Sequence, residues 1–81
     1  MYLTAACPFC QSAERLLADK GVSDIEKIRV DLHPERRAEM RQKSGRHTVP
    51  QIWIGSRHVG GCDDLYALER QGGLDALLKG S

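Results

Sequence analysis

Two cysteines separated by two residues follow a short strand-like segment, and this arrangement limits the folds that the chain can adopt. The range Met1–Thr4 has the composition of a strand. Pro8, which follows Cys7, suits the first position of a helix, because that position needs no N–H donor. Apolar residues then recur at helical spacing through position 20, and Gly21 ends the helix. Cys7 and Cys10 therefore lie at a strand-to-helix junction.

The remaining elements follow from the spacing of apolar residues and from glycine and proline. We expect a second strand that includes Ile28 and Val30 and ends near Asp31, followed by a charged helix from Pro34 to just before Gly45. A hairpin should occupy residues 51–59, with its turn at Gly55-Ser56. A last helix should begin near Asp63 and pause at Gly72-Gly73 before a short tail.

This order of elements predicts an α/β fold. Strand, helix, strand, helix, hairpin and helix form a mixed four-stranded sheet flanked by helices, and its first two strands are parallel through a right-handed crossover. The outline resembles a thioredoxin-like fold of minimal size. A chain of 81 residues supports one core, so we expect one domain over residues 1–81.

Composition excludes several classes of function. Twelve basic and eleven acidic residues are interspersed and give a net charge of +1, so the chain presents no basic field for nucleic acid. No apolar run approaches the roughly 20 residues that span a bilayer, and Met1–Ala6 lacks the regions of a signal peptide. We therefore expect a cytoplasmic protein that binds neither nucleic acid nor membrane.

The cysteine pair suggests thiol-disulfide chemistry. Three cysteines cannot all pair in structural disulfides, and a C-x-x-C motif at a strand-to-helix junction is typical of redox proteins. Cys7 would occupy the N-cap, where unpaired N–H groups and the helix dipole stabilise a thiolate. Cys10 lies one helical turn later and points inward. We therefore expect Cys7 to attack and Cys10 to resolve.

A zinc half-site is the alternative, because two cysteines at this spacing often supply two of four ligands. Cys62 with His47 or His58 would complete it. Pro8 and the strand-helix frame favour redox chemistry, so no metal is expected.

Three separated segments resemble the glutaredoxin family, in its dithiol, bacterial form. They are Cys7-Pro8-Phe9-Cys10, Thr48-Val49-Pro50-Gln51-Ile52 and Gly60-Gly61-Cys62-Asp63-Asp64-Leu65, and together they extend over most of the chain. The cysteine motif alone also suits thioredoxins, whereas the three together are specific.

The resemblance implies a glutathione site. Thr48 would belong to the site, Pro50 would be cis, and Val49, just before Pro50, would offer its backbone to the cysteinyl part of glutathione. Gly61, Cys62 and Asp63 would surround the γ-glutamyl carboxylate with N–H groups. Asp63 or Asp64 would accept from the ammonium group, although helix capping alone also accounts for two acidic residues there. Cys62 lies outside the dithiol pair, and packing explains it better than peripheral oxidation or glutathionylation does.

Two positions depart from the family pattern. Thr4 stands where the family commonly has Lys, so one cation near the thiolate is missing. Arg37 or Arg46 would replace that charge at the glycyl carboxylate, although Arg37 also fits a solvated helix face. Phe9 replaces the usual Tyr and keeps an aromatic surface without the hydroxyl.

The resemblance implies an enzyme of redox homeostasis and electron transport. It would reduce protein disulfides and glutathione mixed disulfides, with glutathione as co-substrate and as reductant. Its partners would be disulfide-bonded or glutathionylated proteins, including ribonucleotide reductase, and it would act as a monomer. The alternatives are a redoxin recharged by thioredoxin reductase and an iron–sulfur cluster carrier using Cys7 and glutathione. The segment from Gly60 to Asp64 argues against the first alternative and Pro8 against the second.

Overall fold

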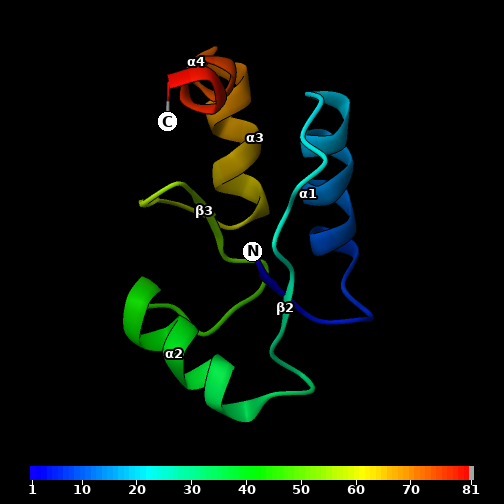
Figure 1. Cartoon of the computed structure of the whole chain (residues 1–81), viewed down its shortest axis with the longest axis vertical. Helices are drawn as coiled ribbons and strands as arrows, with labels where there is room; N and C mark the ends of the chain where they lie inside the picture. The colour runs from blue at the N-terminus through cyan, green and yellow to red at the C-terminus, as the bar shows by residue number, and fades with distance from the viewer. Residues whose placement is uncertain (81) are drawn as a thin grey trace.

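The computed structural model describes residues 1–80, in which helices and short strands alternate (Figure 1). In chain order the elements are β1 (Tyr2–Leu3), α1 (Pro8–Asp19), β2 (Ile28–Arg29), α2 (Pro34–Ser44), β3 (Ile52–Ile54), β4 (Arg57–Gly60), α3 (Cys62–Arg70) and α4 (Gly73–Gly80). The expected element order is present, with one helix added at its end.

The strands form two pairs that one bridge joins. β1 and β2 are parallel, as expected, with Tyr2 opposite Ile28, and β3 and β4 form the antiparallel hairpin. Tyr2 and Gln51 exchange backbone hydrogen bonds of 2.9 and 3.1 Å across the gap between the pairs. In place of one continuous four-stranded sheet, the structure has two two-stranded sheets, β1-β2 and β3-β4, which a single bridge beside β3 joins.

Helices cover the two faces of these joined sheets. Successive strand residues point to opposite faces, so Leu3 packs with α1 and α3, whereas Tyr2 packs against Met40 of α2. Figure 1 shows α1 and α3 side by side, with α2 apart from them. Both clusters are closely packed, since Leu65 and Met40 are fully buried.

The C-terminal segment differs from the expectation. The sequence predicts a short tail after Gly72-Gly73, but residues 73–80 form α4. Gly72 adopts φ +76°, a left-handed conformation that separates α3 from α4, and a second helix begins directly after it. Leu74 is fully buried, and Lys20 at the end of α1 pairs with Asp75 at 3.2 Å. The prediction was wrong because tertiary packing stabilises a helix that is too short to be stable alone.

The remaining boundaries agree to within one or two residues. α2 ends where expected, because Gly45 takes the left-handed conformation at φ +72°. α3 begins at Cys62, one residue before the expected start. Within residues 1–80, every helix is too short or too polar to cross a bilayer.

Candidate active site

Cys7 caps the first helix with its sulfur atom. Its backbone is extended, at φ −131° and ψ 100°, and Pro8 begins α1 directly after it. The Cys10 N–H donates a 3.1 Å hydrogen bond to Cys7 Sγ. This confirms the predicted N-cap position. The bond and the positive end of the helix both stabilise negative charge on the sulfur of Cys7.

Cys10 lies beneath Cys7 and is nearly inaccessible. Its side chain is 1% exposed, against 7% for Cys7. Burial, followed by the neighbouring Cys7, raises the pKa of the Cys10 thiol to about 12. At neutral pH Cys10 is therefore a thiol, whereas Cys7 is the more exposed of the two and its sulfur accepts the N–H hydrogen bond at the helix end.

The segment before β3 approaches the N-terminus of α3. The Val49–Pro50 bond is cis, as the resemblance implies. A Cβ atom placed on Gly61 would lie 3.4 Å from the Pro50 carbonyl oxygen, so a side chain at position 61 would crowd this contact. Val49 packs against the buried cluster that contains Cys7, Cys10 and Cys62. Two of the expected glutathione segments therefore lie beside the cysteine pair.

The N-terminus of α3 is capped by a carboxylate from within the helix. The Gly61 N–H donates to Asp64 Oδ2 at 2.9 Å, and Arg46 Nη1 donates to the same oxygen at 2.7 Å. Both hydrogen bonds lower the pKa of Asp64, and the one from the Arg46 guanidinium has the larger effect. Gly60, at φ +118°, leaves room for this carboxylate, which a side chain there would overlap. Asp63 faces solvent instead.

The other candidate residues divide between the site and its rim. Arg37 of α2 donates to the His47 carbonyl at 3.3 Å, so it lies against the segment that leads to Thr48. Phe9 is 63% exposed beside the cysteine pair. Thr48 is exposed, and Thr4 is half-buried after β1.

Cys62 begins α3 and is buried in the cluster that contains Cys7. Burial and the negative charge of Asp63 both raise the pKa of the Cys62 thiol. A buried neutral thiol at this position fills space in the core, which agrees with the packing interpretation.

Among residues 1–80, His, Cys, Asp and Glu side chains do not gather in groups of three or more that could hold a metal ion. The zinc alternative needs Cys7 and Cys10 together with a histidine. His58 instead bonds to Gln51, with Nε2 at 2.8 Å from Oε1.

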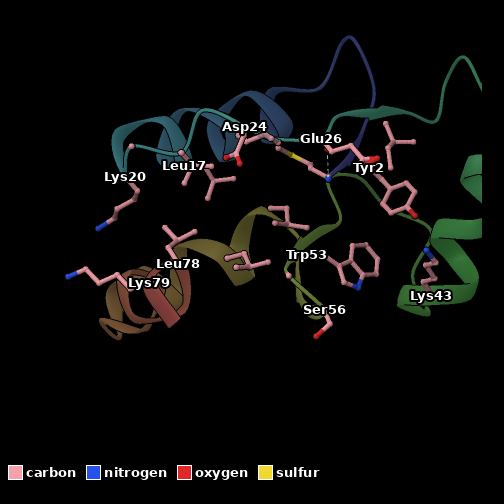
Figure 2. Close-up of a pocket in the computed structure, with 18 of the residues that line it drawn as sticks. Tyr2, Leu17, Lys20, Asp24, Glu26, Lys43, Trp53, Ser56, Leu78 and Lys79 are labelled. Carbon is pink, nitrogen blue, oxygen red and sulfur yellow. Dashed lines mark hydrogen bonds between the residues drawn. The ribbon is translucent and has the colours of Figure 1, made fainter. Parts of the chain in front are cut away.

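A wide groove of about 1210 Å³ lies on another part of the surface. Figure 2 shows Tyr2 and Trp53 at one end and Lys20, Leu78 and Lys79 at the other. Its described lining contains none of the cysteines, and Lys20 is neutralised by Glu69 and Asp75. The groove therefore lacks the reactive sulfur that the cysteine site provides.

Sequence reasoning gave Gln51 no role of its own and considered His58 only as a zinc ligand, although both lie beside the site. Gln51 is fully buried, and its amide donates to the Thr48 carbonyl at 3.0 Å. The available signal was a glutamine at the start of an otherwise apolar strand. The hairpin register pairs His58 with Trp53, so only the folded structure shows that the His58 ring reaches the Gln51 side chain.

The comparisons with known proteins agree with this geometry. A glutaredoxin family model matches residues 1–59. The glutaredoxin of Pseudomonas aeruginosa is 62% identical over 78 residues, which cover 96% of this chain and 92% of the relative. Glutaredoxin 3 of Escherichia coli K12 is 52% identical over 79 residues, covering 98% and 94%. A crystal structure of a buckwheat glutaredoxin–glutathione complex is similar, with a TM-score of 0.89 and 28% identity over 96% of this chain and 73% of that one. The expected fold class is thereby confirmed.

Proposed function

The chain belongs to the glutaredoxin family, and on that basis we propose how its two thiols and its glutathione site work. It is a glutathione-dependent thiol-disulfide oxidoreductase. One observation supports different roles for the two cysteines: Cys7 Sγ caps α1 and accepts the Cys10 N–H, while the Cys10 thiol is buried beneath it. Cys7 is the nucleophile, and Cys10 is the resolving thiol.

Reduction of a glutathione mixed disulfide needs Cys7 alone. The Cys7 thiolate attacks the glutathione sulfur, the old S–S bond breaks, and the substrate thiolate leaves and takes up a proton. A second glutathione thiolate then attacks the glutathione sulfur held on Cys7. The Cys7 thiolate is released with oxidised glutathione.

Reduction of a protein disulfide uses both cysteines. Cys7 first forms a mixed disulfide with one substrate sulfur, and the other substrate sulfur leaves as a thiol. Cys10 then loses its proton and attacks Cys7 Sγ, which releases the reduced substrate and leaves a Cys7–Cys10 disulfide. Two glutathione molecules reduce that disulfide. Because the Cys10 pKa is about 12, Cys10 is protonated at neutral pH and must lose its proton before it attacks the mixed disulfide on Cys7.

We place glutathione along Thr48, Val49 and Pro50, with its γ-glutamyl end at the start of α3. Gly61 has no side chain to cap this helix, and its N–H already bonds to Asp64. The first N–H groups of a helix lack partners within it. The N–H groups of Cys62 and Asp63 are therefore available to the γ-glutamyl carboxylate.

The charges at the two ends of glutathione need separate partners. Asp64 already accepts from Arg46, so the ammonium group either displaces that guanidinium or binds to the exposed carboxylate of Asp63. Arg46 is therefore held at the γ-glutamyl end. Arg37, which lies against the His47 carbonyl, is the cation we assign to the glycyl carboxylate.

Phe9 offers a contact surface for protein substrates. The exposed Phe9 ring provides an apolar contact next to Cys7 for protein substrates. We propose glutathionylated and disulfide-bonded cytoplasmic proteins as substrates, with ribonucleotide reductase among them in an electron-transport role. The protein acts on them as a monomer.

Turnover of a glutathionylated peptide, with glutathione and glutathione reductase, tests this function. Wild-type protein should turn over, and Cys7→Ser should be inactive, because a serine alcohol is not ionised at neutral pH. Cys62→Ala, which also removes a buried sulfur, is the matched control and should remain active. Equal loss in both variants, or turnover with thioredoxin reductase in place of glutathione, would contradict the proposal. A coloured protein as purified would favour the cluster carrier.

A further inference from the structure

Gln51 is a fully buried polar residue whose hydrogen-bonding groups are all used. Its backbone N–H and carbonyl pair with Tyr2 at 3.1 and 2.9 Å, which fixes its position at the bridge between the two sheets. Its side-chain amide reaches back across Pro50 and donates to the Thr48 carbonyl at 3.0 Å. Its oxygen lies 2.8 Å from His58 Nε2. Gln51 therefore joins the sheet to the segment just before the cis bond.

These partners fix the orientation of the amide. A carbonyl oxygen only accepts, so the NH₂ group of Gln51 must face Thr48 and its oxygen must face His58. His58 Nε2 must then carry a proton and donate. Burial and the positive charge of Arg46 lower the pKa of His58, while Asp64 opposes them, so a neutral ring with its proton on Nε2 satisfies the network.

His58 is itself held in place. Its ring lies 4.5 Å from the Trp53 ring, at an angle of 35°. Trp53 in turn contacts the Tyr2 ring edge-on, with centroids 5.4 Å apart. The donor that orients Gln51 is therefore packed into the sheet rather than free in solvent.

We propose that Gln51, oriented by His58, is a positioning residue for glutathione. It holds the Thr48 carbonyl and so fixes the backbone of Val49 against which the cysteinyl part of glutathione binds. This inference rests on the proposed function, since it concerns the same binding edge. Gln51 does not touch the reacting sulfur atoms, so it affects the affinity for glutathione and leaves the reactivity of Cys7 unchanged.

Two substitutions test this role. Gln51→Met keeps the length of the side chain and removes both hydrogen bonds. The KM for glutathione should rise about three- to tenfold, which is the effect of losing roughly one hydrogen bond. The rate of Cys7 alkylation by iodoacetamide, which uses no glutathione contact, should stay within about twofold of wild type. Gln42→Met, at an exposed position on α2, is the matched control and should change neither value.

Gln51→Glu keeps the test decisive if the methionine variant does not fold. A protonated Glu donates to the Thr48 carbonyl and accepts from His58, as Gln does, whereas an ionised Glu cannot donate. Because position 51 is fully buried, desolvation should raise the pKa of the new carboxyl group above the usual Glu value of about 4.3. The ratio of its glutathione KM to that of wild type should therefore be lowest at pH 5 and should rise several-fold by pH 8. A loss of stability alone would produce no such pH step.

The outcomes separate the two proposals. Folded Gln51 variants with an unchanged KM, or an equal loss of Cys7 alkylation and glutathione affinity, would overturn the role of Gln51. A wild-type protein that does not saturate with glutathione would instead overturn the proposed glutathione site.

Discussion

Cys10 should react slowly with an alkylating agent even when it is the only thiol in the protein. The double variant Cys7→Ser, Cys62→Ala isolates it. Burial is the largest cause of its raised pKa of about 12, and these substitutions leave the burial by α1 and the sheet in place. The smaller effect of Cys7 on the Cys10 pKa is lost in this variant, so the pKa of Cys10 should be somewhat lower than in wild type.

The expected rate follows from two opposing effects. A free thiol with a pKa near 8.5 is about 3% thiolate at pH 7, whereas a pKa of about 12 leaves roughly 0.001%, so reactivity falls about 3,000-fold. The more basic thiolate is intrinsically more nucleophilic, by about 40-fold over this interval at a Brønsted slope of roughly 0.45. The net expectation at a pKa of about 12 is a rate about 80-fold below that of a cysteine peptide, and the deficit should be somewhat smaller in the variant, which lacks the contribution of Cys7.

Iodoacetamide labelling followed by mass spectrometry measures this rate. The same variant unfolded in urea is the control, because unfolding removes the burial and should restore the peptide rate. A variant with Cys7 as its only thiol should react faster than the folded Cys10 variant. A folded Cys10 rate within about threefold of the peptide would refute the argument that burial keeps this thiol protonated.

Three further predictions follow from the same site. Cys10→Ser should keep turnover of glutathione mixed disulfides and lose most reduction of protein disulfides in an insulin assay; equal loss of both would contradict the assigned roles. Because the pKa of Asp64 is lowered in the folded protein, its stabilising contribution is present above the unfolded pKa of about 3.9 and is lost as the pH falls below it. Asp64→Asn should therefore unfold earlier than wild type at pH 6, by less than about 1 kcal/mol for such an exposed pair, and the gap in thermal melts should narrow steadily as the pH falls below about 3.9 and through the lowered pKa of folded Asp64. Thr4→Lys should speed alkylation of Cys7 at low salt, with the gain lost at high salt; no change at either would mean that residue 4 points away from the sulfur.

The features predicted well from the sequence depend on neighbours along the chain. Pro8 after Cys7 specifies a helix start, and Gly45 specifies a helix end through its positive φ. The Gly55-Ser56 turn is equally local, because Gly55 at φ +62° supplies the conformation that the hairpin needs. Such signals do not depend on how the rest of the chain folds.

The features that sequence reasoning missed depend on tertiary contacts. Arg46 and Asp64 are 18 residues apart and meet only because the loop before β3 passes the start of α3. The Gln51 and His58 side chains meet through the register of the hairpin, which contains an irregularity between Ile52 and Trp53. Residue types alone indicate neither contact.

The loop that we propose binds glutathione, residues 45–50, is held by hydrogen bonds to side chains at several positions. Ser44 Oγ accepts the Arg46 N–H at 3.0 Å, and Arg37 donates to the His47 carbonyl. Gln51 then holds the Thr48 carbonyl. A segment fixed in this way before ligand binding loses little conformational entropy when glutathione binds.

Because this segment is already ordered, the structural change on glutathione binding should be concentrated elsewhere in the proposed site. The backbone edge at Val49 is already in place, so the adjustment needed on binding falls on the ion pair between Arg46 and Asp64. Both side chains are close to half exposed, and an exposed pair of this kind contributes at most about 1 kcal/mol. An incoming ammonium group therefore meets a weak competitor at Asp64. In the proposed binding mode, the rigid edge would fix the position of the glutathione sulfur near Cys7, while the exchangeable ion pair would let glutathione leave after each exchange step.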